Sequence, residues 1–142
     1  MSKYKFSIII PVYNAEQHLT NSINSVLNQN YYNYELIIIN DCSDDKTLSI
    51  CQKFSKKNKN IILCNQKNNL GIAASRNIGI SKSKGDYIIF LDSDDYLTDG
   101  SLEYLSKLIN QKNNLDVVIC KYMSVRGSSE NIIYNNFNEK SL

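Results

Sequence analysis

Five short apolar segments, each rich in β-branched or aromatic residues, most constrain how this 142-residue chain can fold. Their apolar runs are nearly continuous, which is typical of strands that are buried on both faces of a parallel sheet. We therefore expect a sheet with helices packed on both of its faces. The five segments span residues 5–13, 34–40, 60–66, 86–92 and 115–123.

Helix-like segments separate these expected strands. In the first of them, Leu19, Ile23 and Val26 follow the i, i+4, i+7 spacing of one helical face. The alternating order of strands and helices favours right-handed crossovers and predicts a Rossmann-like, doubly wound, mostly parallel α/β sheet. The helix-like segments span residues 15–29, 45–57, 71–84 and 102–109.

The composition is that of an ordinary soluble globular chain, with 42% hydrophobic residues, 21% charged residues and a net charge of +2. So small a positive excess predicts no nucleic-acid partner. No apolar run approaches the roughly 18 residues of a membrane-spanning helix, and the N-terminal run contains Pro11 and lacks a signal-peptide cleavage site. We expect a cytoplasmic protein whose membrane contacts are limited to peripheral association at the inner face.

Acidic residues gather after two of the expected strands. Six of the nine Asp residues lie in NDCSDD (residues 40–45) and DSDD (residues 92–95). In open α/β sheets the strand-to-helix loops meet at the carboxyl edge, and ligands bind there. Repulsion between the carboxylates would raise some of their pKa values unless a cation or hydrogen-bond donors compensate.

Asp92 and Asp94 are the candidate metal ligands. Side chains two residues apart on an extended backbone point to the same side, so both carboxylates are expected to face one site. Hard oxygen ligands favour Mg²⁺ or Mn²⁺, which accept one or two carboxylates and complete their coordination with water and phosphate oxygens. Asp-x-Asp pairs also occur in ordinary loops and helix caps, and the position directly after an apolar strand favours the metal interpretation here.

The other charged residues of this edge are interpreted individually. Asp44 and Asp45 precede a helix and are assigned to its cap and dipole. Asp41 lies at a strand end, where its carboxylate can accept a hydrogen bond from a ligand N–H. Arg76, in NNLGIAASRN, either pairs with one of the acids or steadies a diphosphate, and the residues leave both alternatives open.

Several other site signatures are absent from the sequence. There is no P-loop, no G-x-G-x-x-G after the first strand and no G-x-S-x-G elbow. His18 is the only histidine and the four cysteines form no C-x-x-C pair, which excludes a zinc site with the usual spacings. Reduced thiols are expected for Cys42, Cys51, Cys64 and Cys120.

Four motifs, taken in order, resemble those of the family 2 glycosyltransferases, which have the nucleotide-diphospho-sugar transferase fold. They are SIIIPVYN, ELIIINDCSDDKT, NNLGIAASRNIGI and GDYIIFLDSDDYL, and the resemblance covers residues 6 to about 123, the N-terminal donor-binding part of such enzymes. It implies an inverting, metal-dependent transfer of a sugar from a nucleotide-sugar, usually UDP-linked, to a hydroxyl of an unknown glycan or lipid-linked acceptor. It also implies a role in cell-surface polysaccharide or glycoconjugate synthesis.

The resemblance also implies roles for individual residues. Asp41 would bind the base, usually uracil through its N3–H, and Arg76 would lie close to the base and the diphosphate. Asp92, near the ribose, would hold Mn²⁺ or Mg²⁺ together with Asp94. The implied donor-binding residues are Pro11, Val12, Tyr13, Asp41, Arg76, Asp92 and Ser93.

The chain departs from the family pattern in two places. Cys42 stands where the family commonly has Gly. Family members also carry an Asp or Glu general base after the fifth strand, and the last acid here, Glu139, matches no such motif, so the catalytic base is unidentified. We therefore divide the chain into a donor-binding domain, residues 1–125, and a tail or the start of a missing acceptor half, residues 126–142.

These departures leave alternatives open. A truncated chain would be a nucleotide-sugar-binding module without turnover, unless a partner chain completes the site. An exposed sheet edge left by truncation would favour a homo-oligomer. A nucleotidyltransferase on the same kind of fold is a third alternative, and the lack of a Gly-rich loop after the first strand counts against it.

Overall fold

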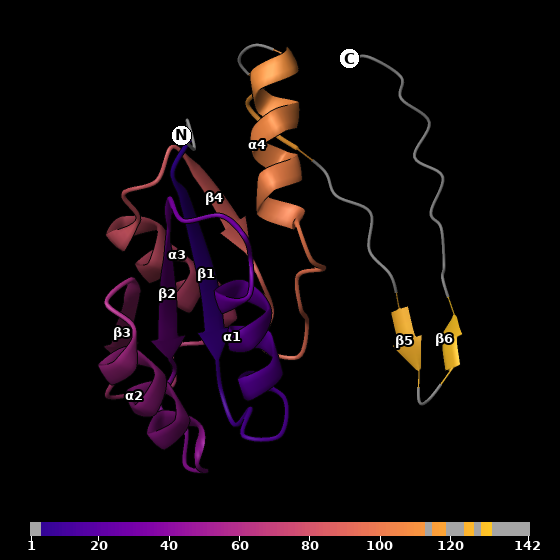
Figure 1. The fold of residues 1–142 in the computed structure, drawn as a ribbon. Helices are drawn as coiled ribbons and strands as arrows, with labels where there is room; N and C mark the ends of the chain where they lie inside the picture. The colour runs from indigo at the N-terminus through magenta and orange to yellow at the C-terminus, as the bar shows by residue number, and fades with distance from the viewer. Residues whose placement is uncertain (1–3, 113–114, 119–123, 127–128, 132–142) are drawn as a thin grey trace.

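The computed structural model describes residues 4–112, 115–118, 124–126 and 129–131. Strands and helices alternate through most of this range (Figure 1). In chain order the elements are β1 (Phe6–Val12), α1 (Leu19–Leu27), β2 (Tyr34–Asn40), α2 (Thr47–Lys57), β3 (Ile61–Asn65), α3 (Ile72–Lys82), β4 (Tyr87–Phe90), α4 (Ser101–Lys112), β5 (Ser124–Arg126) and β6 (Ser129–Asn131).

The first four strands form one parallel sheet in the order β3-β2-β1-β4. β1 pairs along its whole length with β2, from Phe6 opposite Tyr34 to Val12 opposite Asn40. The chain runs outward from β1 to β3 and then returns to the other side of β1 to form β4. The direction of the strand order therefore reverses between β1 and β4, and such a switch point is where doubly wound sheets bind ligands.

Side chains of β1 alternate between two cores because successive residues of a strand point to opposite faces. Ile8 and Ile10 belong to the larger core, which includes buried residues of α1, α2 and α4. Ile9 belongs to a smaller core, against which Ile78 of α3 packs. Helices thus cover both faces of the sheet, and the expected doubly wound α/β fold is confirmed (Figure 1).

α3 approaches the sheet closely at Gly79. A Cβ atom at this position would lie 2.4 Å from Cγ2 of Ile9, a separation that side chains do not tolerate. The missing side chain of Gly79 therefore lets α3 lie directly on β1. This close packing sets the position of the residues at the N-terminal end of α3.

Two expected elements differ from the observed ones. The first helix begins at Leu19 rather than at residue 15, because the N–H of Ala15 donates to Thr47 Oγ1 and ties this segment to the start of α2. The strand expected over residues 115–123 is not observed in its described part: residues 115–118 lie outside any strand and Val117 is 75% exposed. Residues 119–123 lie outside the described residues.

The two C-terminal strands, β5 and β6, pair with each other in an antiparallel hairpin. The domain boundary expected between residues 125 and 126 falls within β5, and residues 132–142 of the expected tail lie outside the described residues. Across the part of the chain that the structure describes, no helix combines the length and the hydropathy needed to cross a membrane.

Candidate functional site

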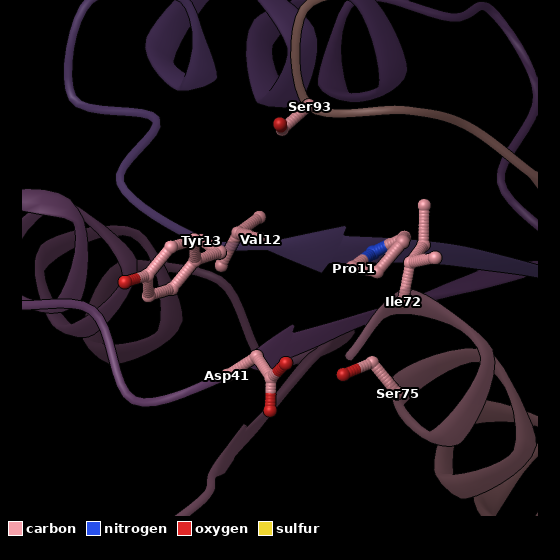
Figure 2. A pocket seen from close by; sticks show the side chains of 7 residues that line it. All are labelled: Pro11, Val12, Tyr13, Asp41, Ile72, Ser75 and Ser93. Carbon is pink, nitrogen blue, oxygen red and sulfur yellow. The ribbon is translucent and has the colours of Figure 1, made fainter. Parts of the chain in front are cut away.

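A pocket of about 180 Å³ lies at the carboxyl end of β1, beside the switch point of the sheet. Five of its lining residues were expected from the sequence to bind a ligand, whereas Ile72 and Ser75 of α3 were not. Figure 2 shows Ser93 on the opposite side of the pocket from Asp41 and Ser75. The lining residues are Pro11, Val12, Tyr13, Asp41, Ile72, Ser75 and Ser93.

Asp41 follows β2 directly and is only 3% exposed. Its Oδ1 accepts the N–H of Leu70 and its Oδ2 accepts the N–H of Gly71, both at 2.8 Å. Each carboxylate oxygen can accept a further hydrogen bond, so Asp41 retains acceptor capacity for a ligand N–H. Gly71 has φ of 83°, a conformation that favours glycine, and α3 begins at the next residue. Asp41 therefore holds the start of α3 and also lines the pocket.

The loops that follow β1 and β2 are joined by hydrogen bonds. Asp45 accepts the N–H of Thr47, the first residue of α2, at 2.8 Å and the N–H of Glu16 at 3.1 Å. Desolvation acts to raise the pKa of Asp45, but its hydrogen bonds with Thr47 and Glu16 together outweigh it and hold the pKa below its usual range. Asn14 Oδ1 accepts the N–H of Asp44 at 3.0 Å. Asp45 thus has the structural role expected from the sequence, and these bonds hold the rim of the pocket together.

Residues 92–95 form a turn, in which the N–H of Asp95 donates to the carbonyl of Asp92 at 3.0 Å. The expectation of an extended backbone at Asp92 and Asp94 is therefore wrong, because both residues belong to this turn. Partial desolvation, followed by the charges of Asp94 and Asp92, raises the pKa of Asp95. The crowding of negative charge predicted from the sequence is thus present at this turn.

The acidic turn does not by itself make a complete metal cage. Among the described residues, no group of three or more His, Cys, Asp or Glu side chains is placed to hold a metal ion. Mg²⁺ and Mn²⁺ are often bound by only one or two carboxylates, with substrate phosphates and water as the other ligands. The acidic turn contains Asp92 and Asp94, which is the number of carboxylates that a site of that kind uses.

Arg76 connects α3 to the acidic turn. Its Nη2 lies 2.8 Å from Asp92 Oδ1, and its guanidinium carbon lies 5.6 Å from the ring centroid of Phe90. Of the two alternatives that the sequence leaves open for Arg76, the structure contains the pairing with an acid. Both side chains of the pair are more than a third exposed, so the pair contributes at most about 1 kcal/mol to stability.

Three polar residues, two in α1 and one just after its end, hold the acidic turn and the loop after it, and the sequence analysis missed them. We call Ser22, Ser25 and Gln29 the α1 polar stripe. Ser22 Oγ donates to the carbonyl of Asp92 at 3.4 Å, and Ser25 Oγ accepts the N–H of Leu97 at 3.0 Å. Gln29 Nε2 donates to the carbonyl of Thr98 in the same loop, and its Oε1 accepts the N–H of Leu102 in α4. Their i, i+3, i+7 spacing beside the apolar face of the helix is the signal that could have identified them.

Comparisons with known proteins agree on one family. The family model described as Glycosyl transferase family 2 matches residues 7–141. The chain is 37% identical over 138 residues to the minor teichoic acid biosynthesis protein GgaB of Bacillus subtilis, covering 94% of this chain and 15% of GgaB. It is 32% identical over 125 residues to the poly(ribitol-phosphate) beta-N-acetylglucosaminyltransferase TarS of Staphylococcus aureus, covering 87% of this chain and 22% of TarS. The chain thus spans less than a quarter of the length of these two relatives.

A solved structure shows the same relationship in three dimensions. The crystal structure of S. aureus TarS 1–349 in complex with UDP-GlcNAc matches with a TM-score of 0.71 and 33% sequence identity. The match covers 75% of this chain and 31% of that chain.

Proposed function

Because the chain belongs to glycosyl transferase family 2, we propose that it is the donor-binding part of an inverting, divalent-metal-dependent enzyme that transfers a sugar from a UDP-sugar to an acceptor hydroxyl. The names of its relatives GgaB and TarS suggest a teichoic acid or a related cell-surface polymer as the product. The TarS complex with UDP-GlcNAc supports a UDP-linked donor.

The observation that carries this proposal is the position of the Asp41 pocket relative to the acidic turn. Asp41 offers a buried acceptor within the pocket, and Ser93 of the acidic turn lines the same pocket. At about 180 Å³ the pocket is smaller than the roughly 300–1,000 Å³ of typical ligand sites, which suits a nucleobase rather than a whole nucleotide-sugar. The base would occupy the pocket, and the diphosphate would extend toward Arg76 and the turn.

Asp92 and Asp94 are the proposed ligands of Mn²⁺ or Mg²⁺. A divalent cation bound there would stabilise the charge that develops on the departing nucleoside diphosphate. Partial desolvation, followed by the charges of Asp94 and Asp92, raises the pKa of Asp95, and a cation bound at the turn would compensate those charges. Arg76 would remain close to Asp92 and add a second positive charge beside the diphosphate.

Calorimetric titration of the 142-residue chain with UDP and with GDP, with and without Mn²⁺, tests the donor site. We expect UDP to bind, and Mn²⁺ to increase its affinity roughly tenfold or more, since interactions with charged groups each contribute about 1.5–3 kcal/mol. Asp94→Ala should abolish the effect of Mn²⁺. Asp99→Ala, which removes an exposed acid five residues after Asp94, is the matched control and should retain it.

Three results would contradict the proposal: no binding of UDP, equal binding of GDP and UDP, or an Mn²⁺ effect that persists in Asp94→Ala. Release of UDP from UDP-sugars in the presence of an acceptor mixture then measures transfer. A chain that binds UDP but releases none beyond slow hydrolysis would be a nucleotide-sugar-binding module rather than an enzyme.

A further inference from the structure

Two buried side-chain atoms on consecutive residues of α3 lack a hydrogen-bond partner within the described part of the chain. They are Ser75 Oγ and Arg76 Nε. Ser75 is fully buried, lines the pocket and directs its hydroxyl toward Asp41 (Figure 2). Serines inside helices commonly bond to a carbonyl of the preceding turn, as Ser81 does to Ile78, but Ser75 makes no such bond.

An unpaired buried hydroxyl is unfavourable in the free protein. A ligand atom that accepts a hydrogen bond from it removes this cost and gains affinity. The pocket is the place where such an atom could arrive, because Ser75 and Asp41 both line it. The unpaired hydroxyl of Ser75 therefore identifies a place where the ligand has to supply a hydrogen-bond acceptor.

We infer that Ser75 is a base-reading residue whose hydroxyl donates a hydrogen bond to a carbonyl oxygen of the uracil held by Asp41. The inference deepens the proposed function and rests on it. Asp41 only accepts hydrogen bonds when ionised, whereas the hydroxyl of Ser75 can donate one. Together the two side chains offer an acceptor beside a donor.

Uracil complements this pair because its N3–H lies between two carbonyl oxygens. With N3–H bonded to Asp41, one of these oxygens faces the hydroxyl of Ser75. Cytosine in the same position would direct the lone pair of its unprotonated N3 at the carboxylate, which is repulsive. Guanine also has an N–H beside a carbonyl, but its double ring is larger than a pyrimidine, and the pocket of about 180 Å³ favours the smaller base. Ser75 therefore contributes to the selection of UDP over CDP and GDP.

Ser75→Ala tests the inference, with Ser81→Ala as the matched control. Ser81 lies on the same helix but is exposed. Calorimetry with UDP and Mn²⁺ should show a roughly two- to tenfold loss of affinity for Ser75→Ala and no loss for Ser81→Ala. The melting temperature of ligand-free Ser75→Ala should equal or exceed that of the wild type, because the variant removes an unsatisfied buried group. A weaker affinity then cannot come from partial unfolding.

Thio-substituted nucleotides identify the contact itself, since sulfur accepts hydrogen bonds poorly. Wild-type protein should bind either 2-thio-UDP or 4-thio-UDP more weakly than UDP, and Ser75→Ala should lose that difference, as in a double-mutant cycle. Unchanged UDP affinity in Ser75→Ala would overturn the inference and leave the proposed function intact. The inference would also be overturned if Ser75→Ala still bound the thio-substituted nucleotide more weakly than UDP. The same holds if the wild-type protein bound both thio-substituted nucleotides with the affinity that it has for UDP. Absence of UDP binding by the wild type would overturn the proposed function and the inference together.

Discussion

At the scale of single residues, Cys42 carries backbone strain beside the pocket. Its φ is 61°, in the left-handed region that L residues other than Asn and Asp rarely adopt, and it follows the buried Asp41. The left-handed conformation costs roughly 1–2 kcal/mol, and glycine loses about 0.5–1 kcal/mol in additional chain entropy. We therefore predict that Cys42→Gly stabilises the chain by about 0.5–1 kcal/mol in urea unfolding.

The control for this prediction is Cys42→Ala, which removes the thiol and keeps the Cβ atom. It should change the free energy of unfolding by no more than about 0.5 kcal/mol, because the strain remains. Equal stabilisation by alanine and glycine would show that the thiol, and not the value of φ, is unfavourable. Since the family commonly has Gly at this position, the pocket should tolerate the glycine variant.

At the scale of elements, α1 both fills the core and holds the acidic turn through the α1 polar stripe. Gln29 is 4% exposed, its Nε2 donates to the carbonyl of Thr98 at 2.9 Å, and its Oε1 accepts the N–H of Leu102 at 3.2 Å. It thus satisfies a free N–H in the first turn of α4. We predict that Gln29→Ala lowers the free energy of unfolding by about 2 kcal/mol, because the N–H of Leu102 loses its side-chain partner and the carbonyl of Thr98 keeps only its bonds to Ser101.

The same variant should weaken Mn²⁺-dependent binding of UDP, since the loop after the acidic turn loses one of its hydrogen bonds to the α1 polar stripe. Gln52→Ala, at an exposed position of α2, is the control and should stay within about 0.5 kcal/mol of the wild type. Urea unfolding and calorimetry measure the two effects. If Gln29→Ala and Gln52→Ala bind UDP equally well in the presence of Mn²⁺, the hydrogen bonds of the Gln29 side chain do not position the turn.

The elements that the sequence predicts well are those whose signal is local. The continuous apolar runs located all four strands of the parallel sheet to within two residues at each end. Residues 15–18 were misassigned because the bond from Ala15 to Thr47 joins segments far apart in the sequence. The turn at residues 92–95 is not predicted by the i, i+2 spacing of Asp92 and Asp94, because β4 ends at Phe90 and its strand geometry does not continue to these residues.

The candidate site follows the same division between local and distant causes. The carboxyl-edge rule placed Asp41 and Ser93 in one region, and both line the pocket. Ser75 could not be found this way, because its burial depends on how closely α3 approaches β1, and Gly79 determines that approach. The sequence motifs indicate which loops meet at the edge of the sheet. That the hydroxyl of Ser75 is buried and unpaired can be seen only in the structure, where α3 packs on β1.

At the scale of the whole molecule, the carboxylates at the two ends of the sheet lie in different surroundings. Glu35, at the amino end and 6% exposed, accepts bonds from Lys5 Nζ and Ser7 Oγ, both at 2.6 Å, and from the N–H of Lys84. Desolvation acts to raise the pKa of Glu35, but these bonds outweigh it and lower the pKa. At the carboxyl end the pKa of Asp95 is raised instead. The amino end thus holds a carboxylate whose bonds are satisfied, whereas the carboxyl end combines the hydrogen-bonded Asp45 with the crowded carboxylates of the acidic turn.

The final prediction concerns acid unfolding, which Glu35 should control. A carboxyl whose pKa is lowered by folding contributes stability above its unfolded pKa of about 4.3, and loses that contribution as the pH falls through its folded pKa. Glu35→Gln should therefore cost about 2 kcal/mol near pH 7 and flatten the loss of stability between about pH 5 and pH 3. Urea unfolding across this range measures both effects.

Glu103→Gln is the control for this prediction, because Glu103 pairs with Lys107 on the exposed surface of α4 at 2.8 Å. An exposed pair four residues apart on a helix contributes about 0.3–0.5 kcal/mol, so this variant should keep the acid sensitivity of the wild type. If Glu35→Gln unfolds in acid as steeply as Glu103→Gln does, protonation elsewhere governs the transition. Asp45, whose pKa is also lowered, would then be the next carboxyl to replace, because its bonds to Thr47 and Glu16 join the two loops at the rim of the pocket.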